Sequence, residues 1–231
     1  HLALPDEAAL AGLPSFVRAA AQQAAAARGL QGQAISLSRS LVMPFLSFST
    51  RRDLREQVWR AWAGRGEHAG EHDNREVARD ILRLRRELAG LHGHACYADH
   101  ALTDTMARNR AAVQGLLDDV WPRALAAVER ERAELLAVMR DEGVDETLEA
   151  WDWRFWAEKV RLQHYALDDA EIKPYFALER VVEAAFDCAG RLFGLQFKLR
   201  ADLPVYHPDV KGYEVSDASG RVVGVFLQDN F

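Results

Sequence analysis

Apolar residues recur every three or four positions along most of the chain as far as about residue 195. This is the spacing of an amphipathic helix, whose apolar side chains gather on one face. The clearest run consists of Val77, Ile81, Leu84, Leu88 and Leu91. In a second long run, Pro122 removes a backbone donor and predicts a kink or a break. The pattern predicts helices near 6–28, 51–63, 74–91, 109–141, 152–165 and 178–193.

From Leu195 onward the apolar spacing changes from helical to alternating, as in a strand with one buried face. Two alternating runs, 213–215 and 222–227, flank the sequence Asp-Ala-Ser-Gly at 217–220. Because this sequence is typical of a turn, we expect a β-hairpin here. Residues 31–38 alternate more loosely and fit either a strand or an extended link.

The change of period predicts two regions. Residues 1–194 are expected to form a multi-helix scaffold, and residues 195–231 a small β-hairpin or sheet element. The predicted fold class is therefore mainly α. No apolar run approaches the roughly 20 residues that a membrane-spanning helix needs, so we expect no membrane partner.

Both ends of the chain are unusual for natural termini, which are mostly polar and loosely held. The chain starts at His1 without an initiator Met, and its last alternating run ends on the apolar side chain of Phe231. We therefore expect the chain to be the interior of a longer protein. The exposed last strand also predicts that the isolated chain self-associates through residues 211–231 or leaves that segment poorly ordered.

The composition changes this picture little. Of the 231 residues, 49% are hydrophobic and 28% charged, which is ordinary for a globular protein. The net charge of -6, with both signs interspersed, argues against a nucleic-acid partner. Cys96 and Cys188 are far apart and lack the C-x-x-C spacing of zinc or redox sites, which fits a reducing cytoplasm.

One stretch matches a metallopeptidase signature. His68, Glu71 and His72 have the H-x-x-E-H spacing of the inverted zinc peptidases. That chemistry needs a helix, which places both imidazoles on one face. Gly66 and Gly70 give this stretch the composition of a loop, so we interpret the match as accidental. A separate metalloenzyme that uses these three residues remains an alternative.

A second group of possible ligands comprises His92, His94, Cys96, Asp99 and His100. Around a helix–turn–helix these side chains are expected to point in different directions, which favours structural roles over a metal site. His207 is isolated between Tyr206 and Pro208. We expect it to be a hydrogen-bonding loop residue, with the edge of an active site as the alternative.

Aromatic residues and paired carboxylates complete the candidates. The aromatic cluster consists of Trp151, Trp153, Phe155, Trp156 and Tyr165. At helical spacing it is more often core than a surface that stacks on a ligand. We expect Asp118 and Asp119 to lie on a solvated face, and Asp168 and Asp169 to cap a helix. No complete active site emerges, so no catalytic, substrate-binding or metal-ligating residue is assigned.

Several longer segments, taken in order, nevertheless resemble one family. They include LREQVWRAWAGRG, ILRLRRELAGLHG, WDWRFWAEKVR, LDDAEIKPYF, ALERVVEAAFDCAGRLFGLQF and LPVYHPDVKGYEVSDASGRVVGVFLQDNF. These segments resemble the thimet oligopeptidase family of zinc metallopeptidases, with the bacterial peptidyl-dipeptidase branch the most similar. The resemblance covers almost the whole chain and is most specific from Trp151 to Phe231.

The resemblance implies a largely helical protein that encloses a channel and cuts short peptides. Members bind zinc through an H-E-x-x-H helix and a later Glu, and that helix follows the region that this chain matches. No H-E-x-x-H occurs in these 231 residues. The family's GEHDNR loop matches Gly70 to Arg75, which makes His68 an accidental addition.

We therefore predict a fragment of a cytoplasmic zinc oligopeptidase or peptidyl-dipeptidase. Short peptides would be the substrates of the parent protein, which would use a zinc-activated water and a Glu as general base. The fragment alone is expected to bind no zinc and to be inactive. The alternative is a standalone helical module that binds peptides or other partners.

Overall fold

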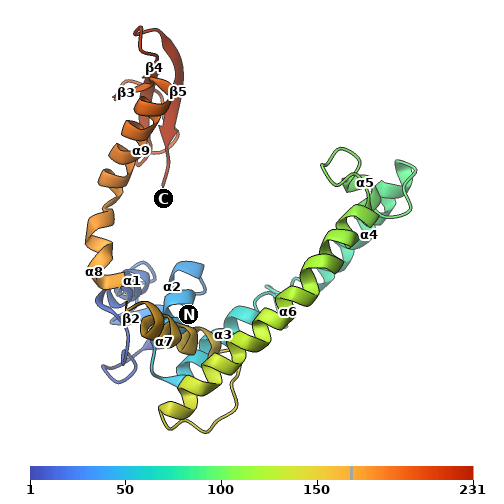
Figure 1. Ribbon diagram of the computed structural model, residues 1–231, viewed down its shortest axis with the longest axis vertical. Helices are drawn as coiled ribbons and strands as arrows, with labels where there is room; N and C mark the ends of the chain where they lie inside the picture. The colour runs from blue at the N-terminus through green and yellow to red at the C-terminus, as the bar shows by residue number, and fades with distance from the viewer. Residues whose placement is uncertain (167–168, 231) are drawn as a thin grey trace. The chain divides into compact units, whose positions relative to one another are not determined.

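The structure, a computed structural model, describes residues 1–166 and 169–230 (Figure 1). It forms two compact units, His1–Leu167 and Asp168–Phe231, and each is described by itself. The described residues are mainly helical, with a small antiparallel sheet near the C-terminal end. This confirms the predicted fold class. The predicted boundary between residues 194 and 195 stays a prediction.

The first unit begins with a small layered core. Its elements are β1 (Leu2–Leu4), α1 (Ser15–Ala26), β2 (Gln33–Ile35), α2 (Arg39–Phe48) and α3 (Arg52–Ala63). The two short strands pair antiparallel, with Ala3 opposite Ala34. Val17, Val42 and Phe45 are almost fully buried between these helices. Burying each such side chain contributes about 1.5–3 kcal/mol, so this cluster stabilises the packing of these helices and strands.

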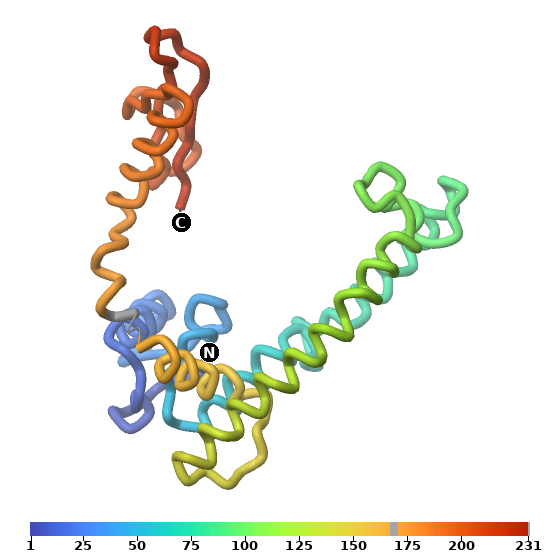
Figure 2. The backbone as a smooth tube through the Cα atoms, viewed as in Figure 1, coloured from blue at the N-terminus to red at the C-terminus, as the bar shows by residue number. Residues whose placement is uncertain are grey.

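A long helical arm follows, made of α4 (Arg75–Leu91), α5 (Tyr97–Ala101) and α6 (Arg110–Asp141). In the tube view α4 and α6 overlap along much of the arm, with α5 near its far end (Figure 2). The side chain of Asn109 caps α6 by accepting a 2.9 Å hydrogen bond from the Ala112 amide. Helix α6 continues through Pro122, so of the two expected outcomes, a kink or a break, the break is wrong. Proline removes one hydrogen bond, but 32 residues of helix supply the rest.

Helix α7 (Trp153–Tyr165) returns to the core of the first unit. It packs against the end of α6, where Leu135, Met139 and Trp156 form a second buried cluster. Trp156 is only 4% exposed. The aromatic residue thus anchors α7 through apolar contact area, as large aromatic side chains commonly do.

A buried carboxylate joins α3 to the start of α7. Asp152 is fully buried and lies 2.7 Å from Nη2 of Arg55 and 2.8 Å from Nη2 of Arg52. The Arg55 guanidinium also donates to the Ser49 carbonyl at 2.7 Å and to the Trp151 carbonyl at 3.3 Å. All the polar groups of this pair are therefore satisfied, which a buried ion pair requires.

These contacts also set the ionisation of Asp152. Burial would raise the pKa of its carboxyl. Hydrogen bonds from Arg52, Arg55 and the backbone amide of Glu149 outweigh burial and lower the pKa below its ordinary value. The folded state therefore holds Asp152 as an anion.

The second unit consists of α8 (Asp169–Ile172), the 3₁₀ turn η1 (Lys173–Phe176), α9 (Leu178–Phe193), β3 (Gln196–Leu199), β4 (Lys211–Ser216) and β5 (Val222–Gln228). The strand order is β3-β4-β5, with every neighbour antiparallel. Phe186 of α9 stacks on Phe197 with ring centroids 4.1 Å apart and meets Tyr213 and Phe226 edge-on. These four rings hold the helix on the sheet.

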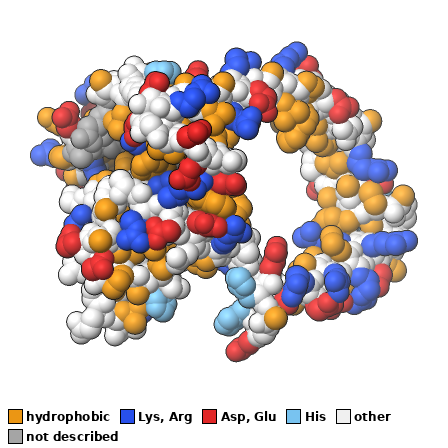
Figure 3. All heavy atoms as spheres, turned by 90° about the horizontal axis from the view of Figure 1, so that it is seen from below, with side chains coloured by type: hydrophobic (Ala, Val, Ile, Leu, Met, Phe, Trp, Pro, Cys, Tyr) orange, Lys and Arg blue, Asp and Glu red, His pale blue; other side chains and the backbone are white. Residues whose placement is uncertain are grey.

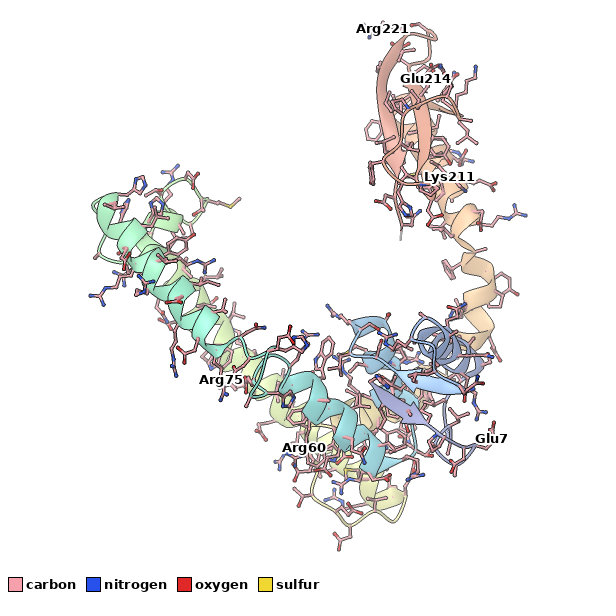
Figure 4. The ribbon with its side chains drawn as sticks, turned by 180° about the vertical axis from the view of Figure 1, so that it is seen from behind. Glu7, Arg60, Arg75, Lys211, Glu214 and Arg221 are labelled. Carbon is pink, nitrogen blue, oxygen red and sulfur yellow. The ribbon has the colours of Figure 1, made fainter. Side chains whose placement is uncertain are left out.

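The β4–β5 turn shows why this sequence forms a hairpin. The Asp217 carboxylate accepts from the amides of Ser219 at 3.0 Å and Arg221 at 3.1 Å, and Gly220 has a φ of +83°. A short acidic side chain and a glycine are what such a turn needs. Figure 4 labels Arg221 here, with Glu214 and Lys211 farther along the hairpin. The predicted hairpin is confirmed.

Many apolar side chains remain at the surface, where Figure 3 shows them between charged groups. On β5, Val223 is 49% exposed and Val225 58% exposed. These two lie on the opposite face of the sheet from Phe226, which contacts α9. Strand β5 is also an edge strand, so one side of its backbone has no strand partner among the described residues. Within the described part of the chain, no helix is both long and apolar enough to cross a membrane.

The predicted helices after residue 50 agree with α3, α4, α6, α7 and α9 to within about a residue. Two differences lie at the N-terminal end. Residues 6–12, which were expected to be helical, form turns, and helix α2 is an element that the pattern did not predict. Residues 33–35 form the strand β2, which settles the choice left open for residues 31–38. The expected cap at Asp168 lies outside the described residues.

We expect Asp152→Asn to lower the free energy of unfolding of the first unit by about 3–5 kcal/mol, because Arg55 would remain buried without its counter-ion. All six tryptophans lie between residues 59 and 156, so tryptophan fluorescence during urea unfolding reports on this unit. Asp119→Asn is the matched control, since the Asp119–Arg123 pair is exposed and should contribute less than about 1 kcal/mol. Equal losses in both variants would contradict a special role for Asp152.

The same ion pair predicts that the free energy of unfolding of the first unit depends on pH. Because the folded state lowers the pKa of Asp152, its contribution is complete above the unfolded value of about 3.9 and is lost as pH falls through the lower folded value. Unfolding free energies measured from pH 6 to pH 2 should fall more steeply below pH 4 for the wild type than for Asp152→Asn. Parallel curves would refute this assignment.

Candidate functional site

The candidate site is a groove of about 570 Å³ in the first unit. Three helices supply most of its walls. The lining residues are Met43, Leu46, Ser47, Trp59, Trp62, Ala150, Trp153, Arg154, Ala157, Glu158 and Arg161. Ligand pockets commonly have volumes of about 300–1,000 Å³, with apolar and aromatic walls and a few polar groups. The groove has this character, with three tryptophans and three charged side chains.

One face of α7 lines the groove. Its lining positions, with Ala150 just before the helix, are 150, 153, 154, 157, 158 and 161. This is the i, i+3, i+4 spacing of one helical face. At 1.5 Å per residue, the eight steps from Trp153 to Arg161 make this wall of the groove roughly 12 Å long. The site is therefore elongated.

The charged side chains are not equivalent. Glu158 receives two hydrogen bonds from Arg161, at 2.8 Å and 2.6 Å, so the negative charge in the groove is neutralised. Arg154 lies one turn before Glu158, yet it makes no hydrogen bond or ion pair within the described residues. The exposed Arg154 guanidinium thus offers its donors to solvent or to a ligand.

Trp151, beside the groove, is fixed by cations and an aromatic neighbour. The guanidinium carbon of Arg60, labelled in Figure 4, lies 5.0 Å from the ring centroid, and the Trp59 ring meets it edge-on at 5.8 Å. Such contacts are worth about 0.5–1 kcal/mol at exposed sites. The buried Nε1 of Trp151 has no acceptor in the described structure.

The H-x-x-E-H match lies in the loop between α3 and α4. His68, Glu71 and His72 are all exposed and none is in a helix. Another contact fixes the end of this loop: Asp73 forms a 2.6 Å ion pair with Arg75. Hydrogen bonds from Arg75 lower the pKa of the Asp73 carboxyl to about 2. The geometry that zinc chemistry would need at these three residues is therefore missing.

The second group of possible ligands is closer together than expected. The ring of His100 stacks on His92 at 4.6 Å and lies 5.4 Å from His94. The expectation that these side chains point in different directions is wrong for the three histidines, because the turn after α4 folds back onto α5. Asp99 is engaged by Arg110 at 2.6 Å and accepts from Cys96. Arg110 lowers the pKa of the Asp99 carboxyl.

The other candidate residues lie in surroundings that favour structural roles. His207 is exposed in a loop and accepts a 3.3 Å hydrogen bond from the Asp209 amide. The aromatic cluster divides, because Trp156 is core, Trp153 lines the groove, and Tyr165 is 73% exposed. Asp118 and Asp119 lie on the exposed face of α6.

No group of three His, Cys, Asp or Glu residues in the described part of the chain is arranged to hold a metal ion. The residues present therefore do not fit a zinc site of the kind that the resemblance implies. We derive no catalytic step through zinc from these residues.

A sequence profile of peptidase family M3 matches residues 45–231. The chain belongs to peptidase family M3. This confirms the resemblance to the thimet oligopeptidase family, and the match includes α3, α7 and most of the lining of the groove.

Individual relatives are similar in sequence to this chain over almost its whole length. The chain is 37% identical over 229 residues to oligopeptidase A of Escherichia coli strain K12, an alignment that covers 97% of the chain and 34% of the relative. It is 38% identical over 232 residues to dipeptidyl carboxypeptidase of Salmonella typhimurium, covering 100% of the chain and 34% of the relative. The chain thus spans about a third of the length of these curated relatives.

The groove was not predicted, because one of its walls was not predicted. Helix α2 carries Met43 and Leu46, and its apolar pairs Leu41–Phe45 and Val42–Leu46 have the i, i+4 spacing of a helix. Pro44 interrupts this short pattern and argues against a helix. The i, i+4 pairs are the signal that could have identified it.

We expect the 231-residue chain to retain no stoichiometric zinc. Ordering an exposed loop around a metal would cost about 1–2 kcal/mol per residue, and the three loop residues are not preorganised. Equilibrium dialysis against zinc, followed by elemental analysis, measures this. One zinc per chain that is lost in His72→Ala, or in His100→Ala for the histidines near α5, would contradict the expectation.

Proposed function

We propose that this chain is part of a zinc metallopeptidase that hydrolyses short peptides, as an oligopeptidase or a peptidyl-dipeptidase. The observation that carries the proposal is the continuous similarity to peptidase family M3 over residues 45–231. An oligopeptidase and a dipeptidyl carboxypeptidase match it over at least 97% of its length. The proposal therefore covers both kinds of peptidase.

In this proposal the described residues act as scaffold and as part of the wall of a substrate channel. The zinc ligands would come from other residues of the longer protein, because the chain has no H-E-x-x-H sequence. Residues 195–231 would lead into that catalytic part. Two observations support this division. The relatives are about three times as long as this chain, and Asp99, the carboxylate of the second group of possible ligands, is engaged by Arg110.

We also propose a cytoplasmic location with short peptides as the partners. Cys96 and Cys188 are both free, which suits a reducing compartment. The net charge of -6 suits neither a nucleic-acid surface nor an anionic membrane.

A second candidate is a helical module that binds peptides without cutting them. The groove between α2, α3 and α7 favours this function, because it is built entirely from residues of this chain. The two candidates differ in whether the longer gene product hydrolyses peptides.

We expect the 231-residue chain to leave an internally quenched nonapeptide intact, with or without added zinc. The complete gene product should hydrolyse the same peptide and lose that activity on treatment with a chelator. A rise in fluorescence over time measures hydrolysis. Zinc-dependent hydrolysis by the 231-residue chain would contradict the scaffold assignment, and an inactive complete product would favour the binding module.

We expect the isolated chain to self-associate through β5. Val223, Val225 and Leu227 are 40–58% exposed on an edge strand, and burying each would contribute up to about 1.5–3 kcal/mol. Sedimentation at rising concentration should show a growing average mass, which Val225→Lys should abolish. Val77→Lys on α4, where Val77 is 54% exposed, is the control. A strictly monomeric chain would contradict the expectation.

A further inference from the structure

We propose that the groove between α2, α3 and α7 binds an extended peptide segment that carries a large apolar side chain next to an acidic one. This goes beyond hydrolysis, because it assigns a peptide-binding surface to a part of the chain that contains no catalytic residue. It rests on the proposed function only in the choice of a peptide as the ligand.

The shape of the groove selects an extended ligand. One wall follows α7 from residue 153 to residue 161, a length of roughly 12 Å. An extended chain rises about 3.3 Å per residue, so about four residues of peptide would fill that length. A compact small molecule would leave much of the groove in contact with water.

The walls select an apolar side chain. Trp59 and Trp62 of α3 line the groove together with Trp153 of α7, and each is partly exposed. Aromatic rings that remain partly exposed can bury area against a ligand at a low entropy cost, because each side chain has only two rotatable bonds. Met43 adds a flexible side chain, which adapts to differently shaped partners.

The charges select an acidic neighbour. Glu158 is neutralised by Arg161 through two hydrogen bonds. Arg154 has no ion-pair partner within the described residues. The groove therefore presents one uncompensated positive charge, and a guanidinium binds a carboxylate in a planar, two-bond arrangement.

Fluorescence polarisation on the 231-residue chain tests the proposal. The probe is a fluorescein-labelled heptapeptide, Ala-Gly-Ala-Phe-Asp-Ala-Gly, compared with the same peptide carrying Phe→Ala or Asp→Asn. We expect saturable binding that weakens tenfold or more without the Phe and about two- to fivefold without the Asp, as a buried aromatic anchor and an exposed charge pair would give. Equal binding of the three peptides, or none, would overturn the proposal.

Variants of the chain locate the binding site. Arg154→Gln should weaken the parent peptide about two- to fivefold, and Arg154→Glu should instead favour a peptide with Lys in place of Asp. Trp62→Leu should weaken binding tenfold or more, with thermal unfolding confirming that it folds. Arg132→Gln on the exposed face of α6 is the matched control. Binding that is insensitive to Arg154 would overturn the assignment.

The complete gene product supplies the last comparison. Peptide binding to it with Arg154 dependence supports a ligand site. If the isolated chain binds the peptide and the complete product does not, another segment of the protein occupies the groove and the proposal is wrong. Binding is measured in the presence of a chelator, which prevents hydrolysis. A complete product that does not bind the peptide therefore does not argue against the proposed hydrolysis. A complete product that does not hydrolyse peptides does not argue against the proposed binding.

Discussion

The first unit depends on one buried carboxylate. Asp152 joins Arg55 across 97 positions of sequence, and the chain between them includes the whole arm of α4, α5 and α6. Closing such a long loop costs little more than closing a shorter one, because the entropy cost grows only with the logarithm of length. The contact that closes it must be specific, however, and a fully hydrogen-bonded Arg–Asp pair provides a defined geometry that apolar packing alone does not.

This pair also determines where the groove can form. Arg55 lies on α3 and Asp152 directly precedes α7. Once the ends of the two helices are joined, Trp59 and Trp62, one and two turns beyond Arg55, come to face the first turns of α7. Arg55 stacks on Phe155 at 4.2 Å, so the ion pair and the aromatic packing support the same placement. The groove is thus a consequence of the way α3 and α7 are tied together.

The sequence predicted the long helices and the hairpin, because their periods extend over enough residues to dominate local alternatives. It did not predict α2, where ten residues with Pro44 inside give a weak pattern that tertiary packing around Phe45 overrides. Nor could it predict the site. The groove combines side chains from residue 43 to residue 161, and no local spacing reports such an association. The approach of the three histidines near α5 was missed for the same reason.

The distribution of ion pairs gives a physical argument for the scaffold role that we propose for this part of the chain. A carboxylate that binds a metal or moves a proton needs free lone pairs and a pKa suited to its task. Here Asp73, Asp99 and Asp152 are each held by arginine, and the pKa of each carboxyl lies below its ordinary value. A metal would have to displace a guanidinium at each of them. These arginine–carboxylate pairs thus fix loops and helix ends. In the groove, the guanidinium of Arg154 is the one that remains open to a ligand among the described residues.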